Sequence, residues 1–194
     1  MNSAVIDKRE KILKAALNLF TERGFHNTPT SLIAKEAGVA TGTLFHHFKN
    51  KEELINRLYL DLKKQKMNAL IEAVDETASL QEKLKSMWIN GVQWGIMHPK
   101  EFQFVMQYSN SPFISHLTKE QAMGEYQSTF CLFEQAISDG LIKPAYPEFV
   151  ADYFEGIFNL AVSHFRKYPE KISEENLDLA FDMCWNGIAR VLES

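Results

Sequence analysis

Five side chains between positions 41 and 47 have the chemistry to bind a nucleic acid. They are Thr41, Thr43, Phe45, His46 and His47, which supply hydroxyls, imidazoles and one aromatic ring. No acidic residue lies among them, so a short helix that carried them could approach phosphates and base edges without charge repulsion. These residue types at this spacing predict contact with double-stranded DNA.

The stretch around these residues, from position 28 to 48, predicts two short helices joined by a tight turn. Ile33, Ala34 and Ala37 fall on one face of the first helix. Gly38 follows, where a left-handed residue can end a helix at little steric cost. Leu44 would then pack the second helix against the core. We interpret the stretch as a helix-turn-helix whose second helix is the reader.

The flanking segments complete a small helical domain. A first helix is expected over residues 7–23, and a further helix from Lys51, opened by Asn50 as N-cap with Glu53 three residues on. Lys51 would lie at a helix N-terminus, which favours anions. Lys49 and Lys51 are therefore candidates for phosphate contact, although a solvated charged surface is the alternative.

The charge distribution fits such a division of labour. The 194 residues carry a net charge of −4, yet residues 1–66 hold twelve lysines and arginines against seven acidic residues. Residues 67–194 hold nine against eighteen. A basic head on an acidic body indicates a protein whose two parts face different partners.

The segment from about Arg9 to Tyr59 resembles the DNA-binding domain of the TetR family of bacterial repressors. The resemblance implies a homodimeric transcriptional repressor that binds a palindromic operator and is released by a small hydrophobic or aromatic ligand. It rests on the matching residues Ala15, Ala16, Leu19, Phe20, Gly24, Phe25, Thr28, Ile33, Ala34, Ala37, Gly38, Val39, Gly42, Thr43, Leu44, Phe45, Phe48, Lys51 and Leu54.

The same resemblance implies roles for individual residues of the reader. Thr43 and His47 would contact the DNA backbone, while Thr41, Gly42 and His46 would lie near base edges. Gly42 would allow a close approach of the protein backbone. Since this stretch offers no arginine aimed at guanine, we expect modest base readout that depends partly on DNA shape.

Four positions depart from the family pattern. Pro29 stands where a hydroxyl is usual and Thr30 where an apolar residue is usual, so that either Thr28 or Thr30 could cap the helix that follows. Ala40 replaces a helix-capping serine, and Phe45 replaces a more frequent tyrosine. The family's phosphate-contacting hydroxyl is therefore missing at position 45.

The rest of the chain predicts a larger helical body. Expected helices run from Lys51 to about Val74, from Ser79 with Glu82 as a capping box to His98, over 99–108, from Thr118 to Gly140, over 147–168, and from Ser173 to Leu192. The fold class is all-α, with a helix-turn-helix domain at 1–50 and a ligand-binding and dimerisation domain at 51–194. The last two helices would form a four-helix dimer seam, or else pack within one subunit.

The body is rich in aromatic residues, with 18 of the chain's 23 from position 80 onward. Its local sequence is similar to RamR-type multidrug-efflux regulators around Trp88 and Trp94. This similarity implies a ligand pocket near Tyr59, Trp88 and Phe158, with Glu155 as an acidic partner. Burial in an ordinary core is the alternative for Trp88 and Phe158.

Other chemistry finds little support in the sequence. The six histidines lack metal-binding spacing, and no nucleophile or phosphate-loop motif is present, so we expect no metal, no cofactor and no enzyme. Two distant cysteines and the absence of a long apolar run fit a cytoplasmic protein without membrane contact. A second hypothesis is a ligand-independent DNA-binding regulator whose acidic body binds a protein partner.

Overall fold

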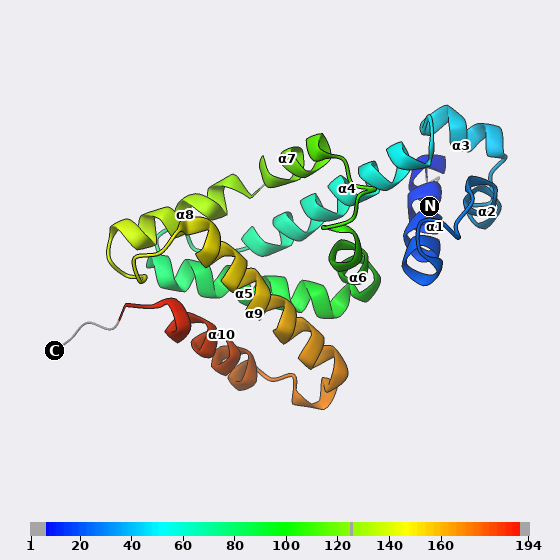
Figure 1. Cartoon of the computed structure of the whole chain (residues 1–194). Helices are drawn as coiled ribbons and strands as arrows, with labels where there is room; N and C mark the ends of the chain where they lie inside the picture. Colours follow the sequence, from blue (N-terminus) through cyan, green and yellow to red (C-terminus); the bar gives the residue numbers. More distant parts are fainter. Residues whose placement is uncertain (1–6, 125, 191–194) are drawn as a thin grey trace. The chain divides into compact units, whose positions relative to one another are not determined.

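The computed structural model describes residues 7–124 and 126–190, and it is built from helices (Figure 1). The predicted all-α fold class is confirmed: within those residues, strand geometry is confined to one isolated bridge between Ile142 and Ala189. The helices are α1 (Lys8–Arg23), α2 (Thr30–Glu36), α3 (Thr41–His47), α4 (Lys51–Ile71), α5 (Leu80–Met97), α6 (Pro99–Tyr108), α7 (His116–Gly124), α8 (Gln127–Ser138), α9 (Pro147–Lys167) and α10 (Glu174–Ile188), with a short 3-10 helix at Pro169–Lys171.

The chain packs as two compact units that do not follow chain order. The first contains residues up to 64 together with 99–122, and the second contains 65–98 together with 123 onward. Helix α4 therefore begins in the first unit and ends in the second. The functional division at residue 50 stays a prediction.

In the first unit, α1, α2 and α3 pack around one core as the sequence predicts. Ile12, Phe20, Ile33 and Leu44 are fully buried in it. The turn between α2 and α3 closes at Gly38, whose φ of +66° is the left-handed conformation that glycine adopts without strain. The helix-turn-helix is confirmed.

Helix α6 belongs to this first unit because it packs on α1. The Tyr108 hydroxyl donates a hydrogen bond to the Phe20 carbonyl at 3.1 Å, and burial raises the pKa of Tyr108. After α6, the Phe113 ring stacks on Phe25 at a centroid distance of 4.0 Å. Asn56 of α4 holds the same segment, since its amide donates to the Phe113 carbonyl at 2.9 Å.

In the second unit, α5 packs against α8, α9 and α10. Trp88, Val92, Val162 and Phe181 are buried at its centre. The predicted capping box of α5 is confirmed, because the Ser79 hydroxyl accepts from the Glu82 N–H while the Glu82 carboxylate accepts from the Ser79 N–H.

One predicted helix is wrong. The sequence predicted a single helix from Thr118 to Gly140, whereas the structure has α7 and α8. Thr118 does not cap α7 but lies inside it, buried, and its N–H donates to the Ser115 hydroxyl at 3.1 Å. Ser115, three residues earlier, thus caps the first turn, and the helix begins at His116, before the predicted start at Thr118.

Two predicted helix ends also lie too far along the chain. Helix α4 stops at Ile71 rather than Val74, because Ala73 adopts a left-handed φ of 54°. Helix α10 stops at Ile188, since the Arg190 N–H donates to the Leu141 carbonyl at 2.9 Å instead of continuing the helix. The expected end at Leu192 lies outside the described residues.

Candidate nucleic-acid interface

Helix α3 presents a surface free of carboxylates, as its sequence predicts. Thr41, Gly42 and His46 are exposed, and Thr43 and His47 are partly exposed. Phe45, which replaces the family's tyrosine, keeps 46% of its surface exposed. Leu44 anchors the helix from its other face and is fully buried. Helix α3 is thus anchored to the core on one face and carries polar side chains on its outer face.

Neither Thr28 nor Thr30 caps α2 with its side chain. Pro29 is the N-cap residue and provides no side-chain hydrogen bond. Thr28 is fully buried, and its hydroxyl donates to the carbonyls of Leu19 and Gly24 at 3.2 and 2.8 Å. Thr30 is the first residue of α2 and is partly exposed. Thr28 therefore ties α2 to α1, and its hydroxyl does not face solvent.

Lys49 and Lys51, at the start of α4, differ in their surroundings. Lys49 is exposed. The Lys51 ammonium donates to the carbonyls of Phe25 and Thr28 at 2.6 and 3.1 Å, and it lies 4.1 Å from the centre of the Phe25 ring. Desolvation lowers the pKa of Lys51, and the nearby Glu52 opposes that shift. Lys51 thus fastens the start of α4 to the loop between α1 and α2.

The start of α4 is capped as predicted, with one difference. Asn50 accepts from the Glu53 N–H at 2.7 Å, which confirms it as the cap. The Glu53 carboxylate accepts from the Lys49 N–H at 2.8 Å instead of from the N–H of Asn50. Both contacts satisfy backbone donors near the helix end that would otherwise lack a partner.

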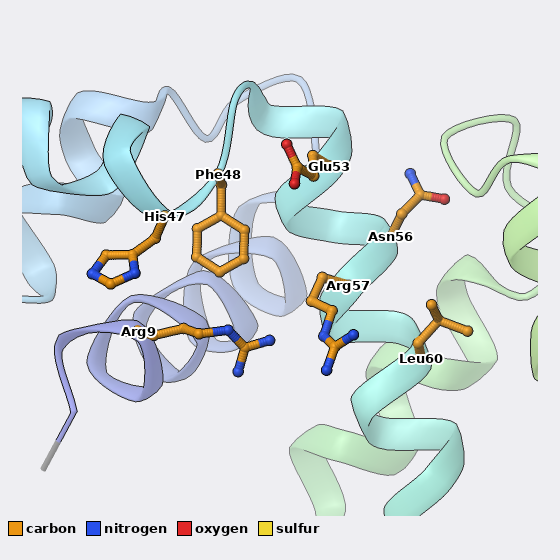
Figure 2. Close-up of a pocket in the computed structure, with 7 residues that line it drawn as sticks. All are labelled: Arg9, His47, Phe48, Glu53, Asn56, Arg57 and Leu60. Carbon is orange, nitrogen blue, oxygen red and sulfur yellow. The ribbon is translucent and has the colours of Figure 1, made fainter.

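Beside α3 lies a surface hollow that the sequence did not reveal (Figure 2). The guanidinium groups of Arg9, from α1, and Arg57, from α4, both contact the Asp61 carboxylate, at 3.3 and 3.0 Å. Arg9 also lies over the Phe48 ring at 5.8 Å. Glu53 also lines the hollow, so the two arginines face two carboxylates, Asp61 and Glu53, beside α3. The residues that line the hollow are Arg9, His47, Phe48, Glu53, Asn56, Arg57 and Leu60.

Four of the five predicted ligand residues are buried, and Glu155 is exposed. Trp88 is 1% exposed and packs edge-on against Phe181, with 5.9 Å between ring centroids. Trp94 lies beside the His98 ring at 5.5 Å. Tyr59 belongs to the first unit, where its hydroxyl donates to the Ser109 hydroxyl at 3.4 Å.

Glu155 and Phe158 meet at a residue that the sequence analysis missed. The Lys66 ammonium lies 3.3 Å from a Glu155 carboxylate oxygen and 4.5 Å from the centre of the Phe158 ring. Lys66 is spaced four residues from both Leu62 and Leu70, which places it on the apolar stripe of α4. A lysine on that stripe was the signal that could have identified it.

Two features are absent from the described residues. No three His, Cys, Asp or Glu side chains among them are grouped so that they could hold a metal ion. None of their helices is both long and apolar enough to cross a membrane.

The fold and the reader define a helix-turn-helix transcriptional regulator, and comparison with known proteins names its family. Residues 12–58 match the family described as bacterial regulatory proteins, tetR family. Residues 79–189 match the tetracyclin repressor-like C-terminal domain. The chain belongs to the TetR family of DNA-binding transcriptional regulators, whose members are not enzymes.

Individual relatives agree with this assignment. The HTH-type transcriptional regulator YhgD of Bacillus subtilis is 24% identical over 177 residues, which cover 89% of this chain and 91% of that protein. A TetR family protein from Shewanella sp. PV-4 has a crystal structure that superposes with a TM-score of 0.89. It is 33% identical, with coverage of 95% of this chain and 100% of that one.

A third relative has been solved with a ligand. The transcriptional regulator FadR of Bacillus subtilis, in complex with stearoyl-CoA, superposes with a TM-score of 0.72. It is 23% identical, and the match covers 92% of this chain and 98% of that one. At this identity the likeness shows the shared fold.

Proposed function

We propose that the chain is a homodimeric transcriptional repressor that binds a palindromic operator and is released from it by a small hydrophobic or aromatic ligand. The observation that carries the proposal is the exposed, carboxylate-free face of α3, held on a three-helix core. In a dimer, two such helices would enter successive major grooves roughly 34–36 Å apart.

Within this proposal, the reader residues divide by what they contact. Thr43 and His47 bind the DNA backbone, and Thr41, Gly42 and His46 lie against base edges. Lys49 adds an exposed cation at the start of α4. The guanidinium groups of Arg9 and Arg57, beside α3, can donate to phosphate oxygens once they turn from Asp61.

A homodimer formed through α9 and α10 is supported by the apolar side chains that these helices leave uncovered. Leu160 of α9 is 64% exposed, and Leu179 and Met183 of α10 are 57% and 69% exposed. Exposed apolar residues grouped on neighbouring helices are typical of protein interfaces. Phe165 of α9 and Phe181 of α10 are buried in the second unit, so they are not available to a seam.

Release by a ligand requires that ligand and operator bind preferentially to different states. The two binding events would then oppose each other through one coupling free energy, typically about 1–3 kcal/mol. The aromatic surroundings of Trp88 and Phe158 support an apolar ligand. FadR, whose structure holds stearoyl-CoA, supports the same class of ligand by analogy.

The test is selection of binding sites from a pooled library of random DNA duplexes at two salt concentrations. The mass of each complex is recorded in parallel. The expected result is a palindromic site bound by two or four chains, with affinity that falls steeply as salt rises. Binding that is weak and independent of sequence in the absence of a ligand would contradict the proposed repressor.

A second candidate function rests on the acidic hollow of α10. A ligand-independent regulator could use this surface to bind a basic protein partner. The hollow is lined by Glu174, Glu175, Asn176, Asp178, Leu179 and Asp182. Thermal shifts with planar, cationic and bile-acid-like compounds discriminate, because a ligand that binds the native state raises its stability.

A further inference from the structure

Lys66 is an unusual residue for the interior of a helical body. It lies on α4 within the second unit and is 4% exposed. A charged lysine is almost never so deeply buried unless its charge is paired. Its surroundings are the Glu155 carboxylate at 3.3 Å, the Phe158 ring at 4.5 Å and the Tyr126 ring at 5.9 Å.

The hydrogen-bonding capacity of this ammonium exceeds what the described residues supply. An ammonium carries three N–H donors. Among the described residues, the one hydrogen-bond acceptor found for it is Glu155. The aromatic rings attract the charge through their faces, but they do not replace a second oxygen acceptor. The Lys66 ammonium can therefore donate a further hydrogen bond to an oxygen of a ligand.

The two members of the pair differ in their access to water, and this difference fixes the charge of the ligand. The Glu155 side chain is 51% exposed, whereas the Lys66 side chain is 5% exposed. If an anion replaced Glu155, the carboxylate could turn into water. If a cation took Glu155 instead, Lys66 would remain buried without a counter-charge, which is strongly unfavourable. The pair accepts an anion much more readily than a cation.

A second buried donor lies in the same unit. The indole N–H of Trp88 has no hydrogen-bond acceptor among the residues that the structure describes. Trp88 is one helical turn from Gly91, on the same face of α5. Phe158 covers Gly91 so closely that an added Cβ would come within 2.8 Å of its ring. Phe158 thus contacts both Lys66 and the part of α5 that carries this N–H.

We propose that Lys66 is the anion-binding residue of the effector site, and that the effector is an amphipathic organic anion. Its carboxylate takes the place of Glu155 on the Lys66 ammonium, and its apolar part lies among the rings of the second unit. Glu155 holds the ammonium in the absence of the effector. This inference rests on the proposed function, because it specifies the ligand of the same body.

The test compares three probes that share a twelve-carbon chain and differ in their head group. Dodecanoate is anionic, dodecyltrimethylammonium is cationic, and 1-dodecanol is neutral. Binding to the full chain without DNA is measured by calorimetry below the micelle concentrations. The expected order of affinity is dodecanoate first, then dodecanol, with the cation weakest.

Three variants assign the binding to the proposed residue. Lys66→Met keeps an unbranched side chain, one atom shorter, and removes the charge, so dodecanoate affinity should fall by about 10–100-fold. Glu155→Gln removes the competing carboxylate and should raise that affinity. Lys64→Met, at an exposed position of the same helix, is the matched control and should leave it unchanged. If Lys66→Met does not fold, Glu155→Gln still decides the question.

Several outcomes would overturn the inference. Dodecanoate could bind wild type and Lys66→Met equally, the cation could bind best, or none of the probes could bind. Failure of the inference and failure of the proposed function remain distinguishable, because operator binding and release are measured separately on the same samples. A probe that releases DNA without dependence on Lys66 would refute this inference while supporting the proposed function.

Discussion

At the scale of single residues, Lys51 has a structural role besides the phosphate contact that the sequence predicts for it. Its ammonium donates to two carbonyls and covers the Phe25 ring. A lysine whose only role was phosphate contact would need no such internal partners. Loss of DNA affinity in a Lys51 variant therefore cannot be interpreted before its stability is known.

We expect Lys51→Met to lower the free energy of unfolding by about 1–2 kcal/mol, because two charge-assisted hydrogen bonds are lost at a partly exposed site. Urea denaturation followed by circular dichroism measures this change. Lys49→Met, at an exposed neighbour, is the control and should stay within about 0.5 kcal/mol of wild type. Equal stability of the two variants would show that the Lys51 contacts contribute nothing.

The two cysteines should differ sharply in reactivity. Cys131 is exposed and Cys184 is buried, and burial raises the pKa of Cys184 to about 12 from an ordinary value of 9.0. At pH 8 a thiol reagent should modify Cys131 quickly and Cys184 only after denaturation, which mass spectrometry of the labelled protein will show. Cys131→Ser should abolish the fast reaction, and Cys184→Ser should leave it intact.

The same shift gives a direction for stability against pH. The folded-state pKa of Cys184 lies above the unfolded value, so its neutral thiol contributes stability that is fully present below about pH 9. That contribution is lost progressively as the pH rises from 9 toward 12. In alkaline denaturation, Cys184→Ala should therefore show a weaker loss of stability across this window than wild type.

At the scale of elements, the end of α4 carries a local strain that can be tested. Ala73 has a φ of 54°, in the left-handed region that disfavours any residue with a Cβ. Asn90 holds the same helix end, donating to the carbonyls of Leu70 and Glu72 at 3.1 and 2.8 Å. The conformation is thus imposed by the contacts of α4 with α5.

Ala73→Gly should accordingly raise the free energy of unfolding by roughly 0.5–1 kcal/mol, because glycine adopts the left-handed conformation without strain. The same substitution at Ala69, inside α4, should lower it by about 1 kcal/mol. Thermal or urea unfolding of both variants is the measurement. A loss of stability in both would contradict the assigned conformation of Ala73.

The elements also show which features a sequence can predict. The helix-turn-helix depends on signals within a few residues, such as the apolar face of Ile33 and Ala34 and the glycine at 38, so it was predicted correctly. The start of α7 was placed too late because Ser115 and Thr118 are both good caps, and only packing selects between them.

The candidate site residues could likewise be predicted only where the signal lies within a few residues of the sequence. The exposed positions of α3 could be predicted because they alternate with buried ones at helical spacing. The sharing of Asp61 by Arg9 and Arg57 could not, since Arg9 and Asp61 are 52 residues apart and meet only when α1 packs beside α4. Lys66 and Glu155, 89 residues apart, likewise carry no local sign that they will pair.

At the scale of the whole molecule, the proposed repressor needs two copies of α3 held at a fixed spacing. The dimer interface is therefore as important to it as the DNA-binding helix. We expect Leu160→Glu combined with Met183→Glu to break the dimer. Each change replaces an exposed apolar side chain of the proposed seam with a charged one. Sedimentation equilibrium should then give the mass of one chain, while circular dichroism stays that of the folded protein.

The control for this experiment is Leu117→Glu. Leu117 is 76% exposed on α7, outside the proposed seam, and its substitution should leave the dimer intact. Because specific binding uses two half-sites, the double variant should also lose affinity for a palindromic operator and keep only the weak, salt-sensitive attraction of a single reader. A double variant that remained dimeric would place the interface on other helices. A monomeric variant that still bound the full operator tightly would contradict the requirement for two readers.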